Sequence, residues 1–215
     1  MLGIVIDDRL NFNDFIKATK KCVNVKLYSF KKLYYLSKNV KSHFFKAFIQ
    51  PHFDYCAALT VYLNKTQVNS IEKFHKVVLF RLLQVKLFGL DSLSQLPLLQ
   101  QFNLMPYRLR LCSRLIIFSH KVVNNVLLSS FGNNLLFKEK CCNISSCTGA
   151  CSRRKQLVSV PDIRTNFGRQ SFAYFLPMIL NVIIKDNYKM NTKNFQLYVS
   201  NNLISLFELF IKNFF

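Results

Sequence analysis

The spacing of apolar residues after residue 13 constrains the fold most, because it follows the period of an α-helix. The first series has separations of seven, four, three and four residues, and its members are Ile16, Val23, Leu27, Phe30 and Tyr34. Residues at these separations lie on one face of a helix. Similar series recur at residues 68–82, 111–122 and 203–210. A helix is also predicted through residues 44–49, which Pro51 bends or ends, and a short one from about Ser94 to Phe102. The pattern therefore predicts a mainly α protein.

Lysines without neighbouring acids accompany the first of these predicted helices. Between residues 15 and 53 there are nine lysines and no aspartate or glutamate. A helix that is stabilised by its own surface charges mixes the two signs, so that i,i+4 pairs form. The whole chain shares this imbalance, with 30 Lys and Arg against 10 Asp and Glu and a formal net charge of +20. Such a charge attracts polyanions, which are nucleic acid or an anionic membrane surface.

Two groups of basic residues lie beside apolar helical stripes and are the candidate nucleic-acid-binding residues. The first group is Lys17, Lys20, Lys21, Lys31 and Lys32, and the second is Arg110, Arg114 and Lys121. Basic side chains that contact phosphates position a nucleic acid without reading its sequence. We expect the first group to make the main contact.

The sequence argues against a membrane or secreted protein. An uncharged, strongly apolar stretch, residues 170–184, is shorter than the roughly 20 residues that a spanning helix needs. The first residues lack the basic start and the small-residue cleavage site of a secretory signal. Seven cysteines, an odd number, are typical of free thiols in a reducing compartment. We therefore expect an intracellular protein, nuclear or cytoplasmic.

Metal binding and catalysis are not expected in this chain. Asp7 and Asp8 follow a short apolar run and have no third acid nearby, whereas two-metal catalysis needs clustered carboxylates. Four cysteines are spaced C-C-x4-C-x3-C with no histidine after them, which is a poor zinc pattern, and they are Cys141, Cys142, Cys147 and Cys151. No nucleophile elbow or phosphate-binding loop occurs. We predict no metal, no cofactor and no catalytic residue.

Changes in composition divide the chain into four segments. Residues 1–12 contain a β-branched apolar run, residues 2–6, that predicts one strand. Residues 13–130 are predicted to form a helical bundle, and residues 131–155 an aperiodic linker rich in Asn, Ser, Cys and Lys. Residues 156–215 combine a strand-like run with helical periods. The predicted fold is mainly α, with an N-terminal strand and a small mixed α/β C-terminal subdomain.

Three stretches carry a resemblance to a known family. The first is residues 2–12, with Gly3 and Asp7 in an L-G-[VI]-x-[LI]-D-x-x-L-x-[FW] pattern. The second is Pro51-His52-Phe53-Asp54-Tyr55-Cys56, and the third is V-P-x-x-R-T-x-x-G-x-x-S-F, which includes Arg164, Gly168, Ser171 and Phe172. Three weaker stretches lie between them: Ile71-Glu72-Lys73-Phe74, the L-M-P-Y-x-x-R run with Pro106 and Arg110, and Lys121-Val122-Val123-Asn124. In their order and spacing, all six resemble the jockey-like non-LTR retrotransposon reverse transcriptases.

The resemblance implies the end of the palm, the thumb and the post-thumb region of such a polymerase. It implies RNA or an RNA/DNA template–primer as the partner, with the missing palm domain as a possible second one. Intact members are RNA-directed DNA polymerases that use Mg²⁺, but their palm aspartates have no counterpart here. Phe15 stands where the family has His, and the chain has no Trp, with Thr60 and residues 180–184 in place of its Trp motifs. We therefore expect a truncated, non-catalytic copy.

Two other functions remain open at this point. A helical protein-interaction module could pack its apolar surfaces against a missing partner domain, without any nucleic-acid function. Peripheral binding to an anionic membrane would also use the positive charge. The oligomeric state does not follow from the sequence.

Overall fold

The computed structural model describes residues 11–31, 35–55, 57–87, 89, 91–124, 158, 160–165, 172–184, 187 and 189–214. These residues are mainly helical, as the apolar periods predicted. The chain divides into two compact units, Met1–Leu111 and Cys112–Phe215. The boundary falls inside helix α6 (Tyr107–Val123), earlier in the chain than the predicted linker. That linker and the strand predicted at residues 2–6 lie outside the described residues.

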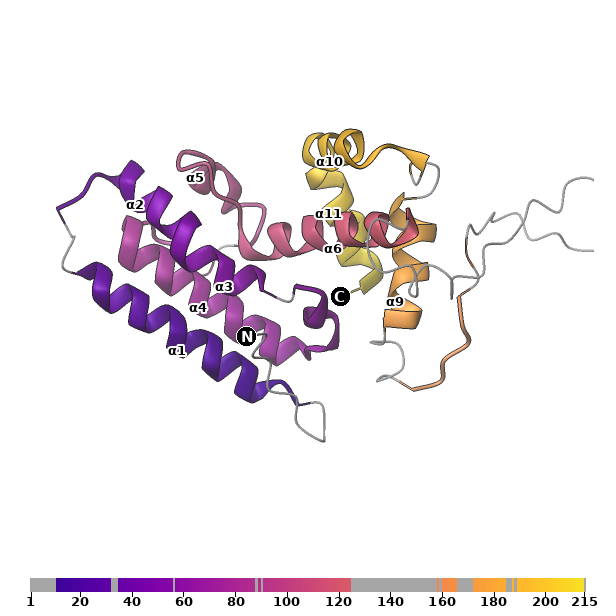
Figure 1. Ribbon diagram of the computed structural model, residues 1–215, viewed down its shortest axis with the longest axis horizontal. Coiled ribbons are helices and arrows are strands. Elements are labelled where there is room, and N and C mark those ends of the chain that lie inside the picture. Colours follow the sequence, from indigo (N-terminus) through magenta and orange to yellow (C-terminus); the bar gives the residue numbers. More distant parts are fainter. Residues whose placement is uncertain are drawn as a thin grey trace, which may run out of the picture. The chain divides into compact units, whose positions relative to one another are not determined.

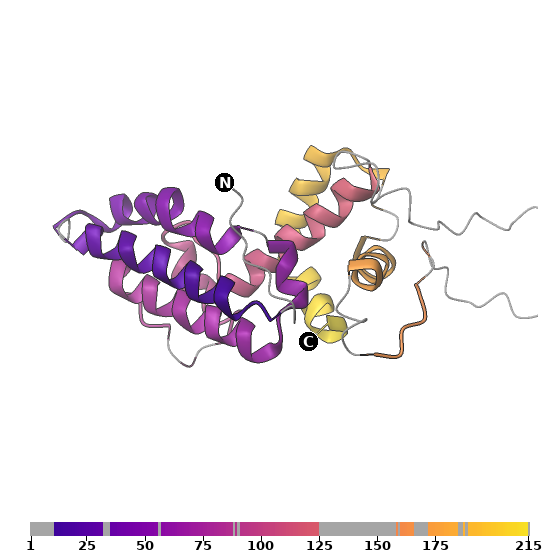
Figure 2. The same ribbon diagram turned by 60° about the horizontal axis from the view of Figure 1, so that its bottom comes forward.

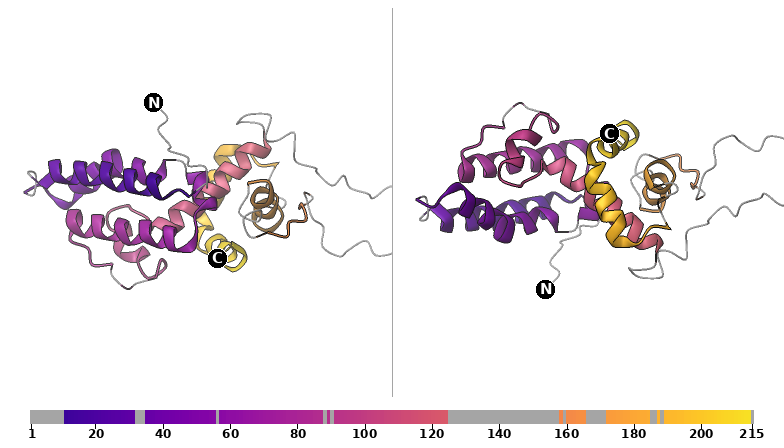
Figure 3. Two further views of the ribbon diagram at one scale, coloured as in Figure 1. Left: turned by 90° about the horizontal axis from the view of Figure 1, so that it is seen from below. Right: turned by 90° about the horizontal axis from the view of Figure 1, so that it is seen from above.

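Three helical rods form the first unit. Helix α1 (Asn13–Phe30) and helix α4 (Lys65–Leu83) lie side by side (Figure 3, left). The third rod consists of α2 (Lys38–Phe44), the π-helical turn η2 (Phe45–Ile49) and α3 (Gln50–Asp54), and it packs against both (Figures 1 and 2). The predicted inward stripe of α1 is confirmed at Ile16, Val23 and Phe30, which are buried.

The predicted apolar face of α4 is also confirmed. Its buried residues include Val68, Ile71, Val78 and Leu82. Burial of each large aliphatic side chain contributes about 1.5–3 kcal/mol to the hydrophobic stabilisation of the unit.

The beginning of α4 is held by a capping box and tied to the beginning of α1. The Asn64 side chain accepts from the Gln67 backbone N–H at 2.8 Å, and the Gln67 side chain accepts from the Asn64 backbone N–H at 3.0 Å. The Gln67 amide also donates to the Oδ1 atoms of Asn11 and Asn13, at 3.1 and 2.9 Å. These bonds fix the end at which α1 and α4 begin.

The proline does not end the helix around Pro51, which was one of the two outcomes predicted for it. The chain forms the π-helical turn η2 and then continues as α3, with Pro51 in its first turn. Proline is tolerated at this position because the first N–H groups of a helix have no partner within it. The wider preceding turn therefore lets the helix continue to Asp54.

Short elements precede and follow α4. The 3₁₀ helix η3 (Ala57–Tyr62) precedes α4, and α5 (Leu96–Gln100) follows it, close to the short helix predicted after Ser94. Gly89 has φ +74°, a left-handed conformation that glycine adopts without strain. The Ser42 hydroxyl donates to the Phe102 carbonyl at 2.8 Å, which attaches the α5 region to α2.

Among its described residues, the second unit contains the later part of α6 and four further helical elements. They are α9 (Phe172–Ile179), the π-helical turn η4 (Leu180–Ile184), α10 (Thr192–Asn201) and α11 (Leu203–Phe214). The predicted inward residues of α11 are all buried, and they are Leu203, Leu206, Phe207 and Phe210. The His120 ring of α6 stacks on Phe195 of α10, with centroids 3.9 Å apart.

The described residues of the C-terminal region contain helices but no strand, so the predicted mixed α/β character is not supported there. Val158, in the strand-like run, occupies a single bridge position. Its N–H donates to the Asn181 Oδ1 at 2.9 Å, and its carbonyl accepts from the Asn181 Nδ2 at 2.8 Å. The Asn181 side chain thus satisfies both backbone groups of Val158, which a neighbouring strand would otherwise do.

Candidate nucleic-acid interface

The outward face of α1 carries three exposed lysines. Lys17, Lys21 and Lys31 are all exposed, and their spacing of four and ten residues keeps them opposite the buried stripe. Tyr28 lies on the same face, and 74% of its surface is exposed. This set, Lys17, Lys21, Tyr28 and Lys31, is called the α1 basic face below. It combines phosphate-binding cations with an aromatic ring that is open to solvent.

Asp14 is the one acid on α1, and it lies beside this face. Its Oδ1 is 3.0 Å from the Lys17 Nζ, with 77% of the lysine side chain and 62% of the aspartate side chain exposed. Exposed pairs of this kind contribute about 0–1 kcal/mol and are screened by salt. The pair therefore leaves Lys17 able to exchange Asp14 for a phosphate.

Lys20 differs from the other predicted lysines because it takes part in packing. Its Nζ donates to the Ser70 Oγ of α4 at 2.7 Å and lies 5.8 Å from the centre of the Phe74 ring. On the opposite flank of α1, the Lys26 Nζ lies 5.9 Å from the Phe48 ring. These two lysines attach α1 to its neighbours in the first unit. Lys32, the last member of the predicted group, lies outside the described residues.

The second predicted group does not share one environment. Arg110 forms two bonds with Asp54 of α3, from Nε to Oδ1 at 2.6 Å and from Nη2 to Oδ2 at 2.5 Å. Arg114 is exposed and Lys121 is half-buried. Only 20% of the Arg110 side chain and 12% of the Asp54 side chain is exposed. The Arg110 guanidinium therefore forms an ion pair within the first unit.

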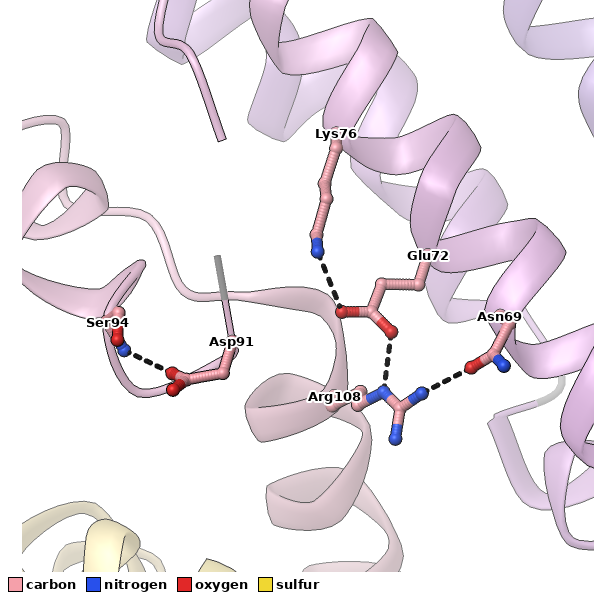
Figure 4. Close-up of polar contacts among 6 residues, drawn as sticks. All are labelled: Asn69, Glu72, Lys76, Asp91, Ser94 and Arg108. Atoms are coloured by element: carbon pink, nitrogen blue, oxygen red, sulfur yellow. Dashed lines mark hydrogen bonds and ion pairs between the residues drawn. The ribbon is translucent and has the colours of Figure 1, made fainter. Parts of the chain in front are cut away.

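A second ion-pair cluster lies next to this one, between α4 and the first turn of α6. Figure 4 shows the Arg108 guanidinium between Glu72 and Asn69, with Nε 2.5 Å from the Glu72 Oε2 and Nη2 2.5 Å from the Asn69 Oδ1. The Lys76 Nζ approaches the other Glu72 oxygen at 3.3 Å. Glu72 therefore balances two cations and is largely buried. Sequence spacing did not predict the Arg108–Glu72 and Arg110–Asp54 pairs, because their partners are 36 and 56 residues apart.

A buried histidine lies among aromatic rings behind these pairs. The His75 ring contacts Phe53, Phe45 and Tyr107, with centroids 5.0, 5.6 and 5.7 Å away. Burial, with the charges of Arg110 and Lys76, lowers the pKa of His75 to about 3. Burial also raises the pKa of Tyr107. His75 is therefore neutral at physiological pH and packs as a core residue.

The remaining residues of the resemblance have varied positions. Pro51 begins α3, Pro106 immediately precedes α6 and is buried, and Phe172 begins α9. Tyr55 and Arg164 are exposed. His52 is half-buried, and burial together with the Lys26 charge lowers its pKa. Gly3, Asp7, Gly168 and Ser171 lie outside the described residues.

Among the described residues, no three His, Cys, Asp or Glu side chains lie close enough to hold a metal ion. The four cysteines between residues 141 and 151, and the Asp7-Asp8 pair, lie outside that part. Within the described residues, no helix has both the length and the apolar character needed to cross a membrane.

Comparison with protein-family models, with curated proteins and with solved structures finds no match to this chain.

Proposed function

We propose that the chain corresponds to the thumb and post-thumb region of a non-LTR retrotransposon reverse transcriptase, and that its first unit binds RNA or an RNA/DNA duplex. The observation that carries the binding proposal is the α1 basic face, which presents three exposed lysines beside a single exposed acid. The proposal about origin depends on the six sequence motifs. An ion pair adds a physical reason for two of them, because Asp54 of the second stretch binds Arg110 of the L-M-P-Y-x-x-R run.

The size of the α1 basic face suits a nucleic-acid backbone. Lys17 and Lys31 are fourteen residues apart, which corresponds to about 21 Å along a helix. Each strand of a B-form duplex carries one phosphate for about every 3.4 Å of helix axis, so several lie within that length. Flexible lysines can follow such a backbone without a fixed register, and binding would be independent of sequence.

In this proposal the chain holds nucleic acid and does not catalyse its synthesis. In two-metal polymerases, clustered carboxylates hold the ions that activate the attacking and leaving oxygens. Those carboxylates belong to the palm in the family that the sequence resembles. The palm would be the natural partner of this region, and the chain's location would be nuclear or cytoplasmic.

Fluorescence anisotropy with labelled RNA tests the binding proposal. The variant with Lys17, Lys21 and Lys31 all changed to Gln should bind two unrelated RNA sequences more weakly, and by the same factor. The matched control changes three exposed lysines outside the face, Lys86, Lys193 and Lys212, to Gln, which removes the same net charge. Equal weakening by both variants would show a general charge effect and contradict a specific face.

A second function is favoured by the apolar surface of α10 and α11. Four large apolar side chains there are between 39% and 63% exposed, and they are Leu197, Ile204, Leu209 and Ile211. Apolar groups that share one exposed face are typical of protein contacts, and Ile204 and Ile211, seven residues apart, share one face of α11. If RNA binding is absent, a helical protein-interaction region becomes the better account. Size-exclusion chromatography with and without a candidate palm domain would then test it.

A further inference from the structure

A pocket of about 650 Å³ lies in the first unit, where α1 and α4 both end. It is lined by the last turns of α1, by the end of α4 and by Lys41 of α2. Its volume falls within the range of about 300–1,000 Å³ that is common for small-molecule sites. Tyr28 and Lys31 belong both to this pocket and to the α1 basic face, so the two are continuous.

The charge of the pocket favours an anion. Three cationic side chains line it, Lys31, Lys41 and Arg81, and no carboxylate is among its described lining residues. The carbonyl ends of α1 and α4 supply some negative charge, but each helix end amounts to only about half an elementary charge. The two ends together therefore offset about one of the three positive charges. The phosphate of one nucleotide in a strand carries one negative charge and would neutralise about half of the remainder.

The other lining residues favour a nucleobase beside that phosphate. Tyr28 offers an exposed ring, and bases of every sequence stack on such rings. Asn24 and Gln84 also line the pocket, and a side-chain amide can both donate to and accept from the edge of a base. Inorganic phosphate or a lipid headgroup would make no use of the ring.

We infer that this pocket holds one unpaired nucleotide of a bound nucleic-acid strand, with its phosphate against Lys31 and Arg81 and its base on Tyr28. The inference rests on the proposed function, since the strand would reach the pocket along the α1 basic face. It adds a preference for strands with an unpaired nucleotide, which the lysines of that face alone would not create.

Titration of the full chain with adenosine monophosphate tests the pocket without a nucleic-acid strand. Saturable binding should follow, stronger than binding of inorganic phosphate. Arg81→Gln and Lys31→Gln should each weaken it, and Tyr28→Ala should weaken it about fivefold or more, whereas Tyr28→Phe should retain it. Lys65→Gln is the matched control, because this exposed lysine of α4 is outside both the pocket lining and the α1 basic face. Failure to saturate, or equal binding by Tyr28→Ala and the unchanged chain, would overturn the inference.

A second measurement compares two RNA duplexes, one blunt and one with a single unpaired 3′ nucleotide. The unchanged chain should prefer the second duplex, and Tyr28→Ala should remove that preference while it still binds the blunt duplex. Equal affinity of the unchanged chain for both duplexes would overturn the inference and leave the proposed function intact. If the unchanged chain binds adenosine monophosphate saturably but does not bind the blunt duplex, that result would instead contradict the proposed function. Thermal denaturation of each variant verifies that it is folded.

Discussion

Arg110 and Asp54 form a largely buried ion pair with two hydrogen bonds, at 2.6 and 2.5 Å, that attaches the first turn of α6 to the end of α3. Both residues lie in stretches that carry the sequence resemblance. Their separation of 56 residues along the chain makes the pair a tertiary contact that helps define the first unit. Arginine and carboxylate planes that meet in this way combine charge with fixed geometry.

Removal of one member of this pair should destabilise the first unit strongly. In the Asp54→Ala variant the Arg110 charge would stay largely buried without its carboxylate, and we expect a loss of about 3 kcal/mol. Urea denaturation of the unchanged chain and the variant measures the difference in the free energy of unfolding. The double variant with Arg110→Met should recover part of the loss, because the second change removes the unpaired charge. A loss below about 0.5 kcal/mol would show that the pair contributes little.

Acid should destabilise the protein through His75. The pKa of His75 is lowered to about 3 in the folded protein, whereas an unfolded histidine titrates near its ordinary value of 6.5. Between these two pH values the unfolded chain binds a proton that the folded chain does not, so stability falls as the pH falls from about 6.5 toward 3. The contribution approaches about 1.4 kcal/mol per pH unit.

The His75→Phe variant isolates this contribution. Phenylalanine suits the surrounding rings of Phe45, Phe53 and Tyr107 and carries no proton. The difference in unfolding free energy between pH 7 and pH 4.5 should therefore be smaller in the variant than in the unchanged chain. Identical differences would mean that His75 is protonated in the fold or exposed to solvent.

Changing Gln84 to glycine should stabilise the protein. It ends α4 with φ +58°, in the left-handed region, where a side chain costs about 1 kcal/mol and glycine does not. Gln84→Gly should therefore raise the free energy of unfolding by about 0.5–1 kcal/mol. Asn103, with φ +57°, is the matched control, because asparagine tolerates this conformation better than glutamine. Asn103→Gly should thus give the smaller gain in thermal denaturation.

The sequence predicted helices where a single period governs the burial of side chains. The stripes of α1, α4 and α11 agree with the structure because each helix buries one face against its own unit. The helix through Pro51 was predicted to bend or stop there. The apolar period of the sequence does not predict the π-helical turn that precedes Pro51. In that turn Phe45 and Ile49 are buried in the core.

The candidate site was predictable only in part. The lysines of α1 were evident from composition, and Tyr28 shares their helical face at spacings that the sequence already contained. Arg110 was predicted as a phosphate contact, whereas the structure pairs it with Asp54. Lys20 was grouped with the outward lysines, although it bonds to Ser70 of α4. Arg81 was not singled out, because its place beside Lys31 depends on the packing of α1 against α4. Such partners, distant in the chain, do not follow from periodicity.

The salt dependence of RNA binding tests the central claim most directly. Each lysine that neutralises a phosphate steepens the plot of log affinity against log salt concentration by about 0.7–0.9. The variant with Lys17, Lys21 and Lys31 changed to Gln should therefore flatten the slope by about 2, while the Lys86, Lys193 and Lys212 control retains it. Circular dichroism should show the same helix content in all three proteins. An unchanged slope in the α1 variant, with helix content intact, would contradict nucleic-acid binding through the α1 basic face.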